Sequence, residues 1–221
     1  PALTLTQVSI TAHNQRLRLP SIDLKITAGE RVGLHGESGS GKSSLLLALL
    51  GFIEYSGRIE INKQSLLDVK RSDWHSQLGY LSQQPNFKRG SLADNLRLAK
   101  PTADTQQMLD VLRDVDLLSL VEQLPQGLNT PLGERGLGLS GGQLSRLAIA
   151  QLLLRDAHLW LLDEPTAHLD PETSATIHAL LARLSVGKTL IWVSHQWQGL
   201  DWLDRHLDLH QLQSQQESSV C

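Results

Sequence analysis

The sequence predicts an α/β domain with a mostly parallel sheet and a helical lobe inserted between its strands. Three observations lead to this prediction. Short apolar strands alternate with helices, a glycine-rich loop separates one strand from a helix, and helical spacing dominates the middle of the chain. With 221 residues, the chain is long enough for one such domain with a sizeable core.

The first part of the chain is predicted to form strands around one helix. Residues 3–10 alternate apolar and polar side chains, as a half-exposed strand does. Residues 42–50 have the composition of a helix, which Gly51 ends. Further short strands are expected at 22–26, 31–35, 58–61 and 78–81.

The middle and last parts of the chain differ in the spacing of their apolar residues. Residues 91–154 show helical spacing interrupted by prolines, and two buried strands at 159–162 and 189–193 flank a helix at 171–184. We therefore expect a RecA-like sheet core, a helical subdomain and a polar, frayed tail. Their expected bounds are 1–83 with 156–210 for the core, about 84–155 for the helical subdomain, and 211–221 for the tail.

The stretch GESGSGKSS, residues 36–44, has the spacing of a P-loop. Its glycines allow successive N–H groups to turn toward one phosphate, and the following helix adds its own N–H groups. Lys42 supplies a charge for the phosphates, and Ser43 a hydroxyl for Mg²⁺. A flexible turn with a chance lysine is the alternative. The predicted nucleotide-binding residues here are Gly36, Ser38, Gly39, Ser40, Gly41, Lys42, Ser43 and Ser44.

Two adjacent carboxylates end the strand in HLWLLDEP, residues 158–165. In a P-loop protein the first, Asp163, can bind Mg²⁺ alongside Ser43, and the second, Glu164, can polarise an attacking water. An acidic strand-to-turn junction without chemistry is the alternative.

A second phosphate-binding pattern stands at LSGGQ, residues 139–143. Ser140 fits the N-cap of a helix, and the following glycines let a phosphate approach the helix N-terminus. A plain capped helix start is the alternative. One bound nucleotide needs only one such cradle, and the P-loop already provides it.

Together these motifs resemble the nucleotide-binding domain of ABC transporters, from about Leu3 to Leu209. The resemblance implies the ABC type of P-loop NTPase fold, with an antiparallel β part beside the mainly parallel sheet. It also implies hydrolysis of ATP with Mg²⁺, which Ser43, Gln83 and Asp163 would bind. The implied catalytic residues are Glu164 as general base, His195 as switch histidine, Gln83 in the Q-loop, and Lys42.

The resemblance also implies partners. In this family two domains, identical or different, dimerise head to tail, and the signature of each closes over the ATP of the other. The signature residues here are Ser140, Gly141, Gly142 and Gln143. Because the chain begins with Pro1, we expect a domain excised from a longer chain with an N-terminal transmembrane domain. That places it at the cytoplasmic face of the bacterial inner membrane.

A narrower resemblance is to exporters. The segment LPQGLNTPLGERG, with Glu134, is similar to the exporter-type segment near the coupling loops. The stretches after the P-loop and around LSQQPNFKRG resemble the D subunit of heterodimeric thiol exporters (cysteine and glutathione) that support cytochrome bd assembly. We therefore expect an exporter ATPase, with cysteine or glutathione as the expected cargo. The alternatives are a soluble ABC ATPase acting on nucleic acid or the ribosome, and a nucleotide-gated dimerisation module.

Three departures from the family pattern stand out. Ala12 occupies the place of the aromatic ring that stacks on adenine, with His13 as the nearest substitute, which predicts weak discrimination between ATP and GTP. His168 stands in the D-loop where a small residue is usual. The glycine-containing segment that usually follows the switch histidine is missing or cut short.

Composition excludes several other functions. A net charge of −3 and a pI near 6.3 argue against a nucleic-acid partner. The single cysteine, Cys221, permits no internal disulfide, and the nine histidines form no metal-ligand spacing.

Overall fold

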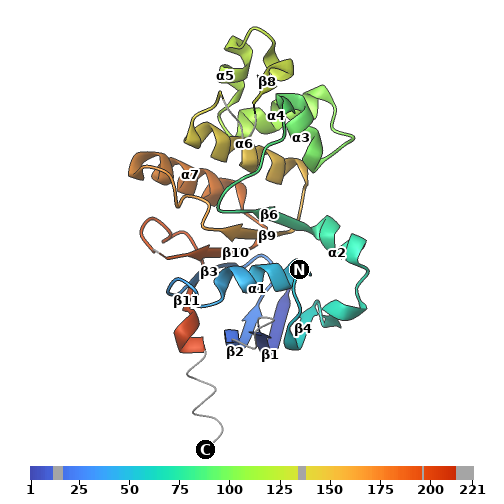
Figure 1. Ribbon diagram of the computed structural model, residues 1–221, viewed down its shortest axis with the longest axis vertical. Helices are drawn as coiled ribbons and strands as arrows, with labels where there is room; N and C mark the ends of the chain where they lie inside the picture. The colour runs from blue at the N-terminus through green and yellow to red at the C-terminus, as the bar shows by residue number, and fades with distance from the viewer. Residues whose placement is uncertain (12–16, 134–137, 196, 213–221) are drawn as a thin grey trace, which may run out of the picture. The chain divides into compact units, whose positions relative to one another are not determined.

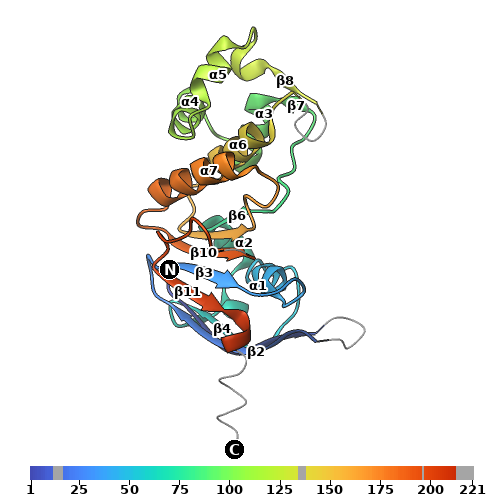
Figure 2. The same cartoon turned by 90° about the vertical axis from the view of Figure 1, so that its left-hand side faces the viewer.

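The computed structural model describes residues 1–11, 17–133, 138–195 and 197–212 (Figures 1 and 2). These residues group into two compact units, each described by itself. The first comprises Pro1–Tyr80, His158–Glu164 and the chain from Ala182 onward, and the second comprises Leu81–Ala157 and Pro165–Leu181. The helical unit thus includes, besides the expected residues, a segment that follows Glu164.

The first unit contains an antiparallel sheet with the strand order β2-β1-β4-β5. Its strands are β1 (Leu3–Thr11), β2 (Leu17–Ile26), β4 (Ser56–Ile61) and β5 (Gln64–Ser65). The 3₁₀ helix η1 (Leu66–Asp68) and helix α2 (Arg71–Gln77) follow this sheet along the chain.

The second sheet of the fold has the order β11-β3-β10-β9-β6, and its strands β11, β3, β10 and β9 are parallel. Figure 2 shows β10, β3 and β11 side by side. The strands are β3 (Arg31–His35), β6 (Leu78–Leu81), β9 (Leu159–Asp163), β10 (Thr189–Ser194) and β11 (Arg205–Asp208). A mainly parallel sheet beside an antiparallel part confirms the predicted fold class.

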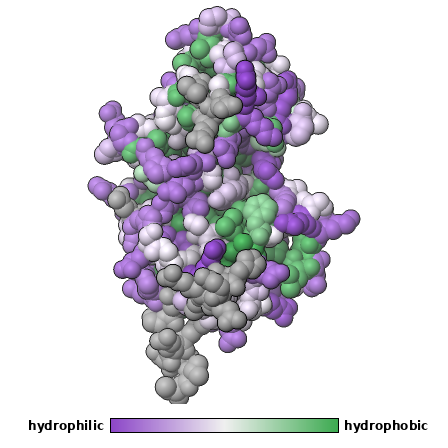
Figure 3. Space-filling model, viewed as in Figure 1, coloured by the Kyte–Doolittle hydropathy of each residue, from purple (hydrophilic) through white to green (hydrophobic). Residues whose placement is uncertain are grey.

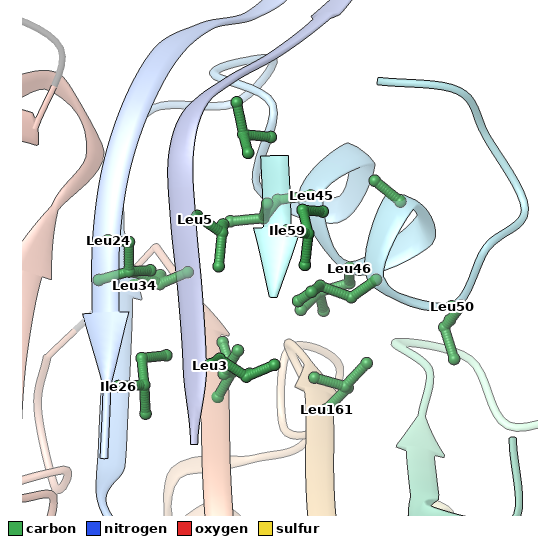
Figure 4. Packing of buried hydrophobic residues seen from close by; sticks show 14 of the residues in the cluster. Leu3, Leu5, Leu24, Ile26, Leu34, Leu45, Leu46, Leu50, Ile59 and Leu161 are labelled. Carbon is green, nitrogen blue, oxygen red and sulfur yellow. The ribbon is translucent and has the colours of Figure 1, made fainter. Parts of the chain in front are cut away.

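The core of the first unit lies between the two sheets and helix α1 (Lys42–Leu49), as Figure 4 shows. Leu5 of β1, Leu34 of β3 and Leu45 of α1 all contribute to it and are at most 2% exposed. Each fully buried leucine side chain contributes about 1.5–3 kcal/mol. The apolar run after the P-loop therefore fixes α1, and with it the loop, against the sheet.

The structure lengthens one predicted strand of this unit and adds four elements that were not predicted, β5, η1, α2 and β11. Strand β2 starts at Leu17 rather than at residue 22, and it tolerates Pro20 because it is an edge strand. Helix α2 is polar, and the indole N–H of its Trp74 donates to the Leu49 carbonyl at 2.6 Å. Strand β11 occupies the segment after the switch histidine, where sequence analysis identified no strand.

The second unit is mainly helical, and most of α7 belongs to it. Serine or aspartate N-caps with reciprocal capping boxes begin α3, α4 and α6, which explains where these helices start. Its elements are β7 (Gly90–Ser91), α3 (Leu92–Ala99), α4 (Thr105–Asp114), α5 (Leu118–Gln123), η2 (Gly127–Asn129), β8 (Pro131–Leu132), α6 (Gly141–Leu154) and α7 (Pro171–Leu184).

The visible surface is largely hydrophilic, and its most extensive hydrophobic area lies on the first unit (Figure 3). Large exposed hydrophobic residues of that unit include Phe52 at 59% and Leu67 at 80% exposure. No helix among the described residues has the length and apolar character needed to cross a membrane.

Candidate functional site

The P-loop backbone adopts the conformation that its glycines predict. Gly39 and Gly41 have φ angles of +84° and +98°, which favour glycine strongly. At Gly41 a Cβ would lie 2.4 Å from the carbonyl oxygen of Arg18, so β2 leaves no room for a side chain there. Gly36 is buried, whereas Ser38 and Gly39 are exposed at the crest of the loop.

Lys42, at the first turn of α1, is 5% exposed and reaches back into the loop. Its Nζ donates to the carbonyl oxygens of Gly36 at 2.6 Å and Glu37 at 2.8 Å, and lies 3.5 Å from Ser40 Oγ. Burial lowers the pKa of the Lys42 ammonium, while the charges of Glu164 and Asp163 oppose that shift. The loop therefore holds a buried cation where the motif requires a charge for phosphates.

The hydroxyl of Ser43 donates to Asp163 Oδ1 at 3.0 Å, so two of the three residues predicted to bind Mg²⁺ lie together. Asp163, at the end of β9, is 8% exposed. A carboxylate and a hydroxyl oxygen at hydrogen-bond distance are suitable ligands for a hard cation. Ser44, the next residue of α1, is half-buried.

Sequence analysis missed one residue of this group, Tyr80. Its hydroxyl donates to the second carboxylate oxygen of Asp163, Oδ2, at 3.4 Å. Burial, assisted by the charge of Asp163, raises the pKa of Tyr80 to about 12. Only the strand order β9-β6 places Tyr80 beside Asp163, and no local pattern in the sequence indicates that pairing.

Glu164 and His195 form a close pair at the ends of β9 and β10. His195 Nε2 lies 2.5 Å from Glu164 Oε1, and the backbone N–H of Glu164 donates to the Val193 carbonyl at 2.9 Å. Glu164 has a φ angle of +48°, a conformation that non-glycine residues seldom adopt and that is concentrated at functional sites. The predicted base and the predicted switch histidine thus contact each other directly.

The Q-loop and D-loop segments lie in the second unit and contact each other. Gln83 follows β6, and the next residue, Gln84, places its Nε2 3.4 Å from Nε2 of His168. Asp170 ends the D-loop, and its Oδ1 accepts a 2.9 Å hydrogen bond from the N–H of Thr173 at the start of α7. His168, the departure noted in the sequence, therefore touches the Q-loop segment.

The signature begins α6 as predicted. Ser140 is the N-cap: its Oγ accepts from the N–H of Gln143 at 3.3 Å, and its own N–H donates to Gln143 Oε1 at 2.9 Å. A Cβ at Gly142 would lie 2.8 Å from Thr173 Cγ2, so this glycine also permits α6 and α7 to pack closely. At Gly141 there is more room, because a Cβ built there would lie 3.4 Å from Leu169 Cδ2.

Four residues discussed in the sequence, Ala12, His13, Glu134 and Cys221, lie outside the described residues, as does the predicted tail from residue 213 onward. The expectations for adenine stacking and for the exporter-type segment stay predictions.

Comparison with known proteins decides the family. A family model described as ABC transporter matches residues 19–167. The chain belongs to the ABC transporter family. It is 37% identical over 197 residues to the glutathione/L-cysteine transport system ATP-binding/permease protein CydD of Escherichia coli strain K12, covering 89% of this chain and 34% of that protein.

The names of other relatives indicate other transported substrates. An ATP-dependent lipid A-core flippase of Neisseria meningitidis is 38% identical over 188 residues, covering 85% of this chain and 30% of the flippase. The structure of a bacterial Atm1-family ABC exporter with ATP bound superposes with a TM-score of 0.87 at 29% identity, covering 94% of this chain and 36% of that one. This chain thus spans about a third of the length of these relatives. It is an ATP-binding and ATP-hydrolysing domain of the exporter type.

Proposed function

We propose that this ABC domain hydrolyses ATP through Glu164 and His195 and thereby energises an exporter. This proposal rests mainly on two contacts in the first unit, Ser43 with Asp163 and Glu164 with His195. The P-loop lysine of the same unit is buried. Glu164 accepts the proton of the attacking water, and His195 holds the carboxylate and contacts the γ-phosphate. Lys42 binds the phosphates.

Mg²⁺ belongs to the same proposal. Ser43 and Asp163 would hold the ion, which would offset charge on the phosphate oxygens, and Gln83 of the second unit stays a predicted ligand. The fit of the site to a hard cation rests on the 3.0 Å contact between Ser43 Oγ and Asp163 Oδ1. Tyr80 orients Asp163 from the other carboxylate oxygen.

The partners form a further part of the proposal. A second ABC ATPase domain pairs head to tail with this one, and the signature residues Ser140–Gln143 close over the partner's ATP. The relatives named ATP-binding/permease protein are about two and a half times as long as this chain, which supports a transmembrane domain in the same transporter. The proposed site of action is the cytoplasmic face of the bacterial inner membrane.

The proposed cargo is a small thiol, cysteine or glutathione, because the match to the glutathione/L-cysteine transport protein extends over 89% of this chain. A lipid cargo is the competing outcome, since the flippase is equally similar in identity. In vesicles containing the full-length protein, we expect cysteine or glutathione to accumulate in an ATP-dependent manner. Accumulation of neither thiol, together with ATP-dependent lipid translocation, would contradict the thiol proposal.

Glu164→Gln tests the hydrolytic mechanism. The amide keeps the size of the side chain but cannot take a proton, so kcat should fall by about 10²–10⁴-fold while ATP binding persists. ATP binding is measured by equilibrium titration and turnover by phosphate release, with Glu172→Gln, an exposed glutamate of α7, as the matched control. Turnover of Glu164→Gln within about threefold of the unchanged protein would exclude Glu164 as the base.

A further inference from the structure

A tryptophan two residues after the switch histidine fills a hole in the central sheet. In the register of that sheet, Gly33 of β3 lies beside Trp192 of β10 and His206 of β11. Side chains of such neighbours point to the same face, so Gly33 leaves a gap between two large residues. A Cβ at Gly33 would lie 2.7 Å from the Cζ3 atom of Trp197, which shows that this indole occupies the gap.

Two histidine rings and a leucine hold the indole of Trp197 in place. The ring of His35 lies 4.8 Å from it, and the ring of His206 meets it edge-on at 4.5 Å. Leu203 also lies at this gap: its Cδ1 atom is 3.0 Å from the position that a Cβ at Gly33 would occupy. Aromatic contacts at such distances have a preferred geometry and stabilise by about 0.5–1.5 kcal/mol each beyond burial. The indole is thus fixed from several directions.

Strand β10 ends at Ser194, which pairs with His35 of β3, so the sheet holds the backbone before His195 but not the chain after it. The side chain of His195 is 44% exposed, and its contact with Glu164 does not by itself define the path of the chain after β10. Two residues of extended chain span at most about 7 Å. The fixed position of Trp197 therefore limits where the backbone of His195 can lie.

We propose that Trp197 is a positioning residue for His195: its indole, seated on Gly33 between His35 and His206, anchors the chain that carries the switch histidine to β3, the strand that leads into the P-loop. This inference rests on the proposed function of His195. The anchor connects the phosphate-binding loop and the histidine through one rigid ring, so that both keep their mutual geometry during turnover.

The first test is kinetic and uses the full-length protein. Trp197→Ala removes the anchor, and we expect kcat to fall by about 10- to 100-fold, as misplacement of a catalytic group by about 1 Å does. The Kd for ATP should change by less than about twofold, because Lys42 and the P-loop are untouched. Trp197→Phe, which keeps an aromatic ring over Gly33, should restore most of the lost turnover.

Trp202→Ala is the matched control. Trp202 lies five residues further along the same segment and packs on Trp192, with ring centroids 5.7 Å apart, and under Arg31. Its removal deletes a similar indole from the same unit but leaves the ring over Gly33 in place. We expect a loss of thermal stability like that of Trp197→Ala with kcat within about twofold of the unchanged protein.

The deciding test is a double-mutant cycle with His195→Ala, measured in single turnovers with labelled ATP and excess protein. If Trp197 acts through His195, then adding Trp197→Ala to His195→Ala lowers the residual rate by less than about twofold. Losses that multiply would overturn the positioning role and leave the function of His195 intact. A normal kcat for His195→Ala would instead overturn the proposed function of the histidine itself.

Gly33→Ala supplies a variant that keeps every functional group. The added methyl group collides with the indole, so the same fall in kcat is expected as for Trp197→Ala. In the Trp197→Ala background the methyl group should lower kcat by less than about twofold. An unchanged kcat in Gly33→Ala protein whose fold is intact would count against the anchor.

Discussion

Replacement of Gly41 by alanine is predicted to destabilise the first unit far more than the same change at Gly39. Both glycines have positive φ angles, +98° and +84°, so alanine costs about 1–2 kcal/mol at either position. Only at Gly41 would the new Cβ also meet neighbours, 2.4 Å from the Arg18 carbonyl oxygen and 2.9 Å from Leu19 Cβ. At Gly39 nothing lies within 4 Å.

The magnitude follows from these contacts. Overpacking against a backbone that cannot retreat costs about 1–3 kcal/mol, because β2 is paired with β1 along this stretch. Gly41→Ala should therefore lose about 2–5 kcal/mol of unfolding free energy, against about 1–2 kcal/mol for Gly39→Ala. The assay is urea unfolding of both variants without nucleotide, followed by the tryptophan fluorescence of the first unit.

Equal losses for the two variants would refute this reasoning, because the difference between them rests entirely on the contact of Gly41 with β2. A selective loss for Gly39→Ala would refute it more strongly. ATP titrations of the same variants separate stability from binding, since both glycines also shape the phosphate-binding backbone.

Two other predictions concern protons. Because folding raises the pKa of Tyr80 from about 10 to about 12, its stabilising effect is complete below pH 10 and is lost as the pH rises toward 12. Between pH 10 and pH 12 the unfolding free energy of Tyr80→Phe should therefore fall less than that of the unchanged protein. The expected difference is about 1 kcal/mol after allowance for partial exposure. Asn95→Asp should be more destabilising at pH 7 than at pH 4.5, because Asn95 is fully buried and its amide donates to the Lys88 carbonyl at 3.0 Å. A carboxylate facing that oxygen has a raised pKa in the folded state, so stability falls as the pH rises above about 4, and hydrogen exchange of residues 88–95 would report it. A pH-independent effect of Asn95→Asp would contradict the contact.

The sequence predicted those parts of the site that depend on local spacing. The P-loop, the carboxylates after β9 and the capped start of α6 each combine a chain conformation with a chemistry, and both are encoded within about ten residues. Ser140 as N-cap is an example, because a serine before a helical pattern predicts the cap whatever surrounds it.

The parts that were missed depend on partners far along the chain. Strand β11 forms because residues 205–208 pair with β3, and Arg31 of β3 binds Asp204 just before it at 2.9 Å. Helix α2 is polar, and its side chains Arg71, Trp74 and His75 bond to the carbonyls of residues 49–51. Tyr80 joins Ser43 and Asp163, the proposed metal-binding pair, only through strand order. Neither spacing nor propensity in a single segment indicates such contacts.

The groups that the motifs assign to ATP already make hydrogen bonds within their own units. Lys42 donates to loop carbonyls, Ser43 donates to Asp163, and the signature serine is paired with Gln143. These bonds offset the cost of burying polar groups. ATP therefore exchanges one set of hydrogen bonds for another at each of these groups. An exchanged bond contributes about 0.5–1.5 kcal/mol, less than a bond made to an unpaired buried group. Affinity for the nucleotide must then come largely from charge: the phosphates near Lys42, the N-terminus of α1 and the bound cation.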